Sequence, residues 1–197
     1  MTQSANYFNS DNFLKGNIGK NVVKFLLERS KYEVCLYGYE DTLPDVKAKL
    51  KQETNISRNS DTGRRIRSSP DLLVYDDQNI MLVEVKTRGK APKWIGAGRV
   101  RIRSGEIKPL KEFWSDSILV IVVPEGNVFY AQEIGKLTIQ QNDFYSLEDF
   151  EKLQAIFKKV NSEDISHYRD IALQTLQTFM TKKEKALENT PVPSPEF

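Results

Sequence analysis

Two carboxylates and an amine stand at one end of two apolar segments in the middle of the chain. The segments are PDLLVYD, residues 70–76, and NIMLVEVK, residues 79–86, and turn-forming residues separate them. This pattern predicts a β-hairpin, and a turn centred between residues 77 and 78 pairs Asp71 with Glu84. Because side chains alternate along a strand, Lys86 projects from the same face as Glu84.

Two opposed carboxylates require a cation, because like charges on cross-strand neighbours, about 4.5–5.5 Å apart, destabilise a sheet. Mg²⁺ fits this requirement and Mn²⁺ is expected to substitute, since both accept oxygen ligands. Such an ion polarises a phosphoryl oxygen and activates water, while an ammonium offsets charge developing on phosphate. Asp71, Glu84 and Lys86 therefore predict phosphodiester hydrolysis. The alternative is a Glu84–Lys86 salt bridge at a sheet edge, with Asp71 merely starting a strand.

In these residues the sequence resembles the PD-(D/E)xK nuclease superfamily, which includes restriction endonucleases and archaeal Holliday-junction resolvases. The motif stands as Pro70-Asp71, twelve intervening residues, and then Glu84-Val85-Lys86, and the order of predicted elements is also similar over residues 16–131. The resemblance implies an α/β, restriction-endonuclease-like fold with helices flanking a central mixed β-sheet. It further implies a metal-dependent DNA endonuclease, with Mg²⁺ held by Asp71, Glu84 and the Val85 carbonyl and with Lys86 beside the attacked phosphate.

Many members of the superfamily add an acid from the first helix, and here the sequence departs from the pattern. Lys20 occupies the position just after Gly19 where such a helix often places that acid, which leaves Glu28 as the candidate. Two further hypotheses therefore stand beside the nuclease: a catalytically inactive nucleic-acid-binding module of the same fold, and a purely structural α/β domain.

Positive charge is clustered rather than general, because Lys and Arg outnumber Asp and Glu by only 29 to 27. Between residues 86 and 108, however, eight basic residues accompany the single acid Glu106, and glycines would let the backbone approach phosphates. The alternative is that this basic loop is exposed to solvent and contacts no nucleic acid. The residues expected to contact nucleic acid are Arg64, Arg65, Arg67, Arg88, Lys90, Lys93, Trp94, Arg99, Arg101 and Arg103.

Hydrophobic periodicity predicts the other elements. A helix over residues 18–27 precedes a strand at 34–39, a short helix at 43–52, and a loop or edge hairpin at 53–69. Beyond the hairpin, residues 106–114 predict a crossing helix, 117–124 a buried central strand and 127–134 its neighbour, and helices follow from residue 147.

This order suggests a flexible lead-in at 1–15, a nuclease core at 16–145, C-terminal helices at 146–188 and a disordered tail at 189–197. The last helix carries an apolar stripe that is either intramolecular core or the seam of a homodimer. Its members are Ile165, Tyr168, Ala172, Leu176 and Phe179.

One cysteine and one histidine exclude a disulfide framework and a zinc cluster. Cys35 is expected in the core, and His167 at the surface or capping a helix. No signal-peptide pattern and no apolar run of about 20 residues is present, so we expect a soluble, cytoplasmic protein.

Overall fold

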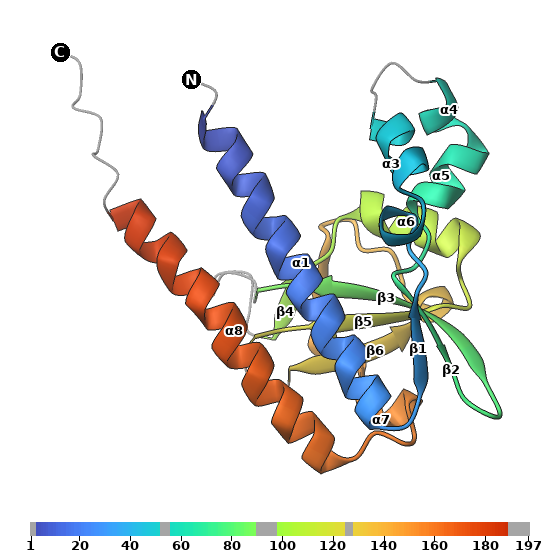
Figure 1. Cartoon of the computed structure of the whole chain (residues 1–197), viewed down its shortest axis with the longest axis vertical. Helices are drawn as coiled ribbons and strands as arrows, with labels where there is room; N and C mark the ends of the chain where they lie inside the picture. Colours follow the sequence, from blue (N-terminus) through green and yellow to red (C-terminus); the bar gives the residue numbers. More distant parts are fainter. Residues whose placement is uncertain (1–2, 52–55, 90–97, 125–127, 189–197) are drawn as a thin grey trace.

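A mixed six-stranded sheet forms the centre of the computed structural model, which describes residues 3–51, 56–89, 98–124 and 128–188 (Figure 1). The strand order is β1-β2-β3-β5-β6-β8, and β3 pairs with β5 in parallel while the other neighbours are antiparallel. The predicted fold class, a mixed sheet flanked by helices, is confirmed. The strands are β1 Glu33–Leu36, β2 Leu72–Tyr75, β3 Ile80–Thr87, β5 Ile118–Val122, β6 Phe129–Glu133 and β8 Glu151–Lys152.

The central strand β5 contributes side chains to two hydrophobic cores, because alternate side chains point to opposite faces of a sheet. Ile118 and Val120 join the core beneath helices α1, Gln3–Arg29, and α8, Ser162–Glu188. These two helices lie side by side in Figure 1. Leu119 joins the opposite core, formed with α6, Ser104–Phe113, and with a two-stranded sheet. That small sheet consists of β4, Arg99–Arg101, and β7, Phe144–Ser146.

Helix α1 is longer than the periodicity predicted. Val22, Val23, Leu26 and Leu27 are buried as expected, but the helix begins at Gln3 and includes most of the predicted lead-in. Residues 3–15 lack an apolar periodicity, yet adding turns to a packed helix avoids the cost of a new nucleus. The helix ends before Lys31, which adopts a positive φ of 66°.

The hairpin has the predicted register. Leu72 pairs with Val83 and Tyr75 with Ile80, which places Asp71 at the position opposite Glu84. The turn is held by Asp76, whose Oδ1 accepts hydrogen bonds from the Gln78 and Asn79 amides at 3.0 and 2.9 Å. The register of the hairpin is thus determined locally, because the Asx-type turn fixes the loop length and the loop length fixes which residues pair.

Residues 56–67 were wrongly predicted as a loop or edge hairpin. They form α4, Ile56–Asn59, and α5, Asp61–Arg67, after the predicted short helix α3, Pro44–Lys51. Ser60 caps α5, with its hydroxyl accepting from the Gly63 amide at 3.1 Å. The serines and glycine that suggested a loop thus begin a helix, because a serine N-cap satisfies an amide that the helix itself leaves unpaired.

Residues 147–160 were wrongly predicted as a helix, whereas the long helix expected after them is present as α8. The segment at 147–160 is divided among a 3₁₀ turn at Leu147–Asp149, the edge strand β8 and the short helix α7, Leu153–Ile156. Its large apolar residues Leu147, Phe150, Leu153 and Phe157 are all buried, but in both cores rather than along one helical face.

The apolar stripe of α8 is largely intramolecular. Ala172 and Leu176 are buried in the core beneath α1, and Ile165 and Tyr168 pack against it, while the Phe179 side chain lies outside the described residues. Among the helices described, none is long and apolar enough to cross a membrane.

Cys35 is exposed, contrary to the prediction of a core cysteine. Strand β1 lies at the edge of the sheet, where only Val34 of its four residues is buried. His167 is exposed, as expected, with its ring 5.0 Å from that of Tyr168.

Gly19 sets the distance between α1 and β3. A Cβ added there would lie 1.9 Å from Thr87 Oγ1 and 3.2 Å from Thr87 Cβ, whereas one added at Gly16 meets nothing within 4 Å. We expect Gly19→Ala to lower the free energy of unfolding by about 1–3 kcal/mol through overpacking. Gly16→Ala, its matched control, should be stabilising by up to about 1 kcal/mol through helix propensity. Denaturant unfolding measures both, and equal stabilities would contradict the expectation.

Candidate active site

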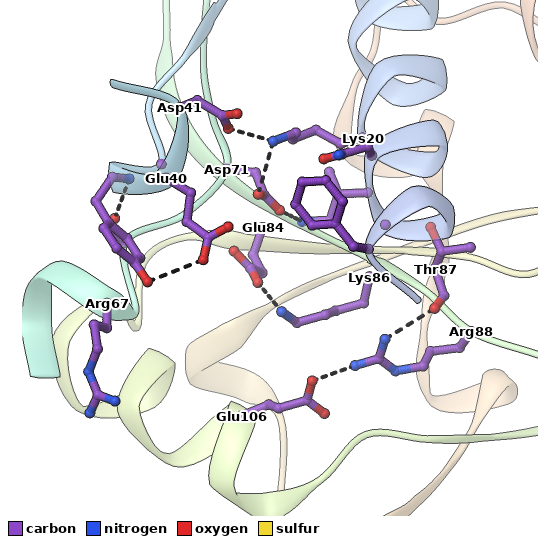
Figure 2. A pocket seen from close by; sticks show the side chains of 17 residues that line it. Lys20, Glu40, Asp41, Arg67, Asp71, Glu84, Lys86, Thr87, Arg88 and Glu106 are labelled. Carbon is purple, nitrogen blue, oxygen red and sulfur yellow. Dashed lines mark hydrogen bonds and ion pairs between the residues drawn. The ribbon is translucent and has the colours of Figure 1, made fainter. Parts of the chain in front are cut away.

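A cavity of about 300 Å³ opens at the rim of the sheet, where β2 begins and β3 ends. Its walls come from α1, from the segment after β1, from the hairpin and from α6. Figure 2 shows Asp71, Glu84 and Lys86 in it, together with Lys20 and Asp41. The structure therefore brings the three predicted hairpin residues together at one place.

Asp71 is anchored across the hairpin. Its Oδ2 accepts a hydrogen bond from the Val85 amide at 2.9 Å, and its Oδ1 lies 3.9 Å from Lys20 Nζ. Burial raises the pKa of Asp71, and the positive charge of Lys86 and the Val85 amide oppose this effect without cancelling it. The carboxyl group is thus held in a fixed orientation with one oxygen turned to the cations of the cavity.

Glu84 and Lys86 form an ion pair inside the cavity. The Glu84 side chain is only 8% exposed, and burial raises its pKa to about 7 although Lys86 acts in the opposite direction. Burial alone would lower the pKa of Lys86, but the charge of Glu84 outweighs it and leaves that pKa raised, so the ammonium is charged at neutral pH. The pair does not lie at a sheet edge, because β3 runs between β2 and β5.

The structure adds Lys20 and Asp41 to the predicted set. Lys20 is 9% exposed, and its Nζ lies 2.5 Å from Asp41 Oδ2. Asp41 belongs to the one-turn helix α2, Tyr39–Thr42. This helix is brought to the motif by the Tyr37 and Gly38 amides, which donate to the Asp71 carbonyl at 2.9 and 3.2 Å. No spacing in the sequence signals that long-range contact.

Glu28 does not reach the cavity, which corrects its prediction as a site acid. It lies eight residues after Lys20 on α1, about 12 Å along the helix axis, and its carboxylate pairs with Lys24 at 2.5 Å. A helix face repeats every three to four residues, but the two turns between Lys20 and Glu28 carry Glu28 beyond the rim of the sheet.

Arg88 and Glu106 close the side of the cavity next to α6. Arg88 Nη2 lies 2.7 Å from Glu106 Oε1, and its other nitrogens donate to the carbonyls of Thr87 and Arg101. Burial acts to raise the pKa of Glu106, but the charges of Arg88 and Lys86 outweigh it and hold that pKa below its ordinary value. Arg88, predicted to contact nucleic acid, is therefore mainly engaged within the protein.

The three arginines of α5 have different surroundings. Arg64 pairs with Glu112 and lies over the Phe113 ring, and Arg65 lies over the Trp114 ring at 5.4 Å. Arg67 lines the cavity, and its buried Nε has no hydrogen-bond partner within the described part of the chain. Of the three, Arg67 is the one that lines this cavity.

The remaining predicted nucleic-acid contacts lie beyond Arg88. Arg99 and Arg101 are exposed on β4, and Arg103 is exposed at the start of α6. Lys90, Lys93 and Trp94 lie outside the described residues.

The residues of the cavity suit a hard divalent cation that retains water. Across the described residues, no group of three or more His, Cys, Asp or Glu side chains is arranged to hold a metal ion. Mg²⁺ is nevertheless commonly bound through one or two carboxylates and several waters. Asp71, which is partly buried, and Glu84, which is buried, supply two such carboxylates facing one cavity.

No protein-family model and no curated protein matches this sequence. Among solved structures, the chain is similar to Hjc of Archaeoglobus fulgidus, described as a Holliday junction resolvase from an archaeal hyperthermophile. The TM-score is 0.47 at 9% sequence identity, and the match covers 75% of this chain and 99% of that chain. A likeness at this level does not transfer an activity.

Proposed function

We propose that the protein is a metal-dependent endonuclease of the PD-(D/E)xK type that hydrolyses DNA phosphodiesters. The observation that carries the proposal is the convergence of Asp71, Glu84 and Lys86 in one cavity beside Arg67. Desolvation raises the pKa values of both carboxylates, so their charged forms are unfavourable by themselves, and a bound cation would stabilise them.

The residues present define the roles. Asp71, Glu84 and the Val85 carbonyl would hold Mg²⁺ or Mn²⁺, which, when bound, polarises a phosphoryl oxygen and lowers the pKa of water. Lys86 orients the attacking water and offsets the charge that develops on the phosphate. The Val85 amide keeps Asp71 in place, and Arg67 positions the phosphate at the mouth of the cavity.

The surface beyond the cavity suggests a backbone-binding rather than a base-reading substrate contact. The exposed arginines Arg99, Arg101 and Arg103 would bind neighbouring phosphates, and phosphate contacts position DNA without specifying sequence. We therefore propose duplex or branched DNA as the substrate.

The test compares cleavage of plasmid, single-stranded and four-way-junction DNA in millimolar Mg²⁺ by the full chain and by Asp71→Asn. We expect metal-dependent cleavage that Asp71→Asn reduces by at least about 100-fold, or roughly 3 kcal/mol of barrier. The matched control is Asp77→Asn, an exposed carboxylate in the turn of the same hairpin, which should leave the rate unchanged.

Binding is measured on the same DNAs in Ca²⁺ by fluorescence anisotropy. Binding without cleavage in Mg²⁺ or Mn²⁺ would support the inactive nucleic-acid-binding module instead. Absence of both binding and cleavage would support the third hypothesis, a purely structural domain.

A further inference from the structure

Lys20 is a buried cation beside two acidic groups of the cavity, Asp41 and Asp71. Its side chain is 11% exposed, and its Nζ lies 2.5 Å from Asp41 Oδ2 and 3.9 Å from Asp71 Oδ1 (Figure 2). Lysine is rarely buried unless it is paired, because removing an ammonium from water is costly. Lys20 is therefore held at this place by specific partners.

The backbone beneath Lys20 is fixed as well. The neighbouring Gly19 packs directly on Thr87 of β3, with no room for a Cβ. On the other side, Gly38 lies against the Asp71 backbone, where an added Cβ would be 3.5 Å from Asp71 Cα. The tight contact of Gly19 with Thr87 and the hydrogen bonds to the Asp71 carbonyl thus bring α1 and α2 to the motif, with Lys20 between Asp41 and Asp71.

The positive charge of Lys20 disfavours binding of a second metal ion beside Asp71. In two-metal sites the ions lie about 3.5–4 Å apart and share a carboxylate. Here Asp71 Oδ1, the oxygen that does not accept from the Val85 amide, lies 3.9 Å from the Lys20 ammonium. A divalent ion placed there would meet a like charge in a buried setting, where repulsion is weakly screened.

We propose that Lys20 takes the place of a second cation, so that the site binds one divalent ion and the Lys20 ammonium itself binds the scissile phosphate. Asp41 is a positioning residue that holds Lys20 toward the cavity. This inference rests on the proposed nuclease function, since it assigns the first-helix residue of that same site.

The test counts Mn²⁺ ions bound by the full-length protein, using the electron paramagnetic resonance signal of free Mn²⁺. We expect one Mn²⁺ per chain for the native protein and a second for Lys20→Glu, which exchanges the ammonium for a carboxylate beside Asp41 and Asp71. Lys24→Gln, one turn further along α1 and paired with Glu28 outside the cavity, is the matched control and should stay at one ion.

Lys20→Gln and Lys20→Arg keep the inference testable if Lys20→Glu fails to fold. Lys20→Gln should lower the cleavage rate at least about tenfold without weakening binding of the first Mn²⁺, and Lys20→Arg should restore most of the rate. A role limited to structure would weaken metal binding and cleavage together.

Two ions on the native protein, or one on a folded Lys20→Glu, would overturn the inference while leaving the nuclease proposal standing. Absence of both Mn²⁺ binding and cleavage in the native protein would instead overturn the nuclease proposal and this inference with it.

Discussion

Replacing Glu84 with glutamine is expected to abolish cleavage and, at the same time, to make the metal-free protein harder to unfold at pH 8. The loss of a metal ligand should reduce the cleavage rate by about 1000-fold or more, corresponding to at least about 4 kcal/mol of barrier. The gain in stability follows from the pKa of Glu84, which burial raises from 4.5 to about 7.

The sign follows from proton linkage. A carboxyl group whose pKa is raised on folding binds its proton more tightly in the folded state, so stability is lost as the pH rises from about 4.5 to about 7. At about 1.4 kcal/mol per pH unit, the charged form costs roughly 3 kcal/mol above pH 7. Glutamine carries no charge but leaves Lys86 without its anionic partner, so we expect a net gain of about 1–3 kcal/mol.

Denaturant unfolding at pH 4 and pH 8, with and without Mg²⁺, measures this effect. The two proteins should differ at pH 8 and converge toward pH 4, and Mg²⁺ should stabilise the native protein but not Glu84→Gln. Glu148→Gln, at an exposed carboxylate, is the control and should follow the native protein throughout. If the free energies of unfolding of the native protein and Glu84→Gln changed in parallel with pH, the pKa of Glu84 would not be raised on folding.

The parts of the fold that the sequence predicted are those whose signal is local. The hairpin was predicted in register because Asp76 and its neighbours determine the turn, and the turn determines that Asp71 and Glu84 are opposed. The central strand β5 was predicted because a run of five buried apolar residues has few alternatives. Helix α5 was missed because Ser60 and Gly63 are as typical of loops as of caps.

The parts of the site that were missed depend on packing between distant segments. Asp41 joins Asp71 only because the chain after β1 hydrogen-bonds to the Asp71 carbonyl. Lys20 was noticed as a departure from the superfamily pattern, but its burial against Asp41 depends on how closely α1 approaches β3. Basic clustering likewise could not reveal that Arg88 is satisfied within the protein.

Lys86→Met is expected to lower the cleavage rate by about 100- to 1000-fold and to move metal binding to higher pH. Methionine retains an unbranched side chain of similar length, so packing changes little. Removing the ammonium takes away a donor that faces the developing charge on the phosphate, which accounts for the loss of rate. It also removes the main opposition to burial at Glu84, so the pKa of Glu84 should rise above about 7.

The two effects of Lys86 are separable, because only one of them depends on the protonation of Glu84. A metal ion binds the carboxylate and displaces its proton, so Mn²⁺ affinity of Lys86→Met should fall at pH 7 and recover by about pH 9. The cleavage rate at saturating Mn²⁺ should remain low at both pH values if the ammonium acts on the phosphate. Full recovery of the rate at pH 9 would mean that Lys86 serves only to keep Glu84 ionised. Lys108→Met, exposed on α6, is the control and should alter neither quantity.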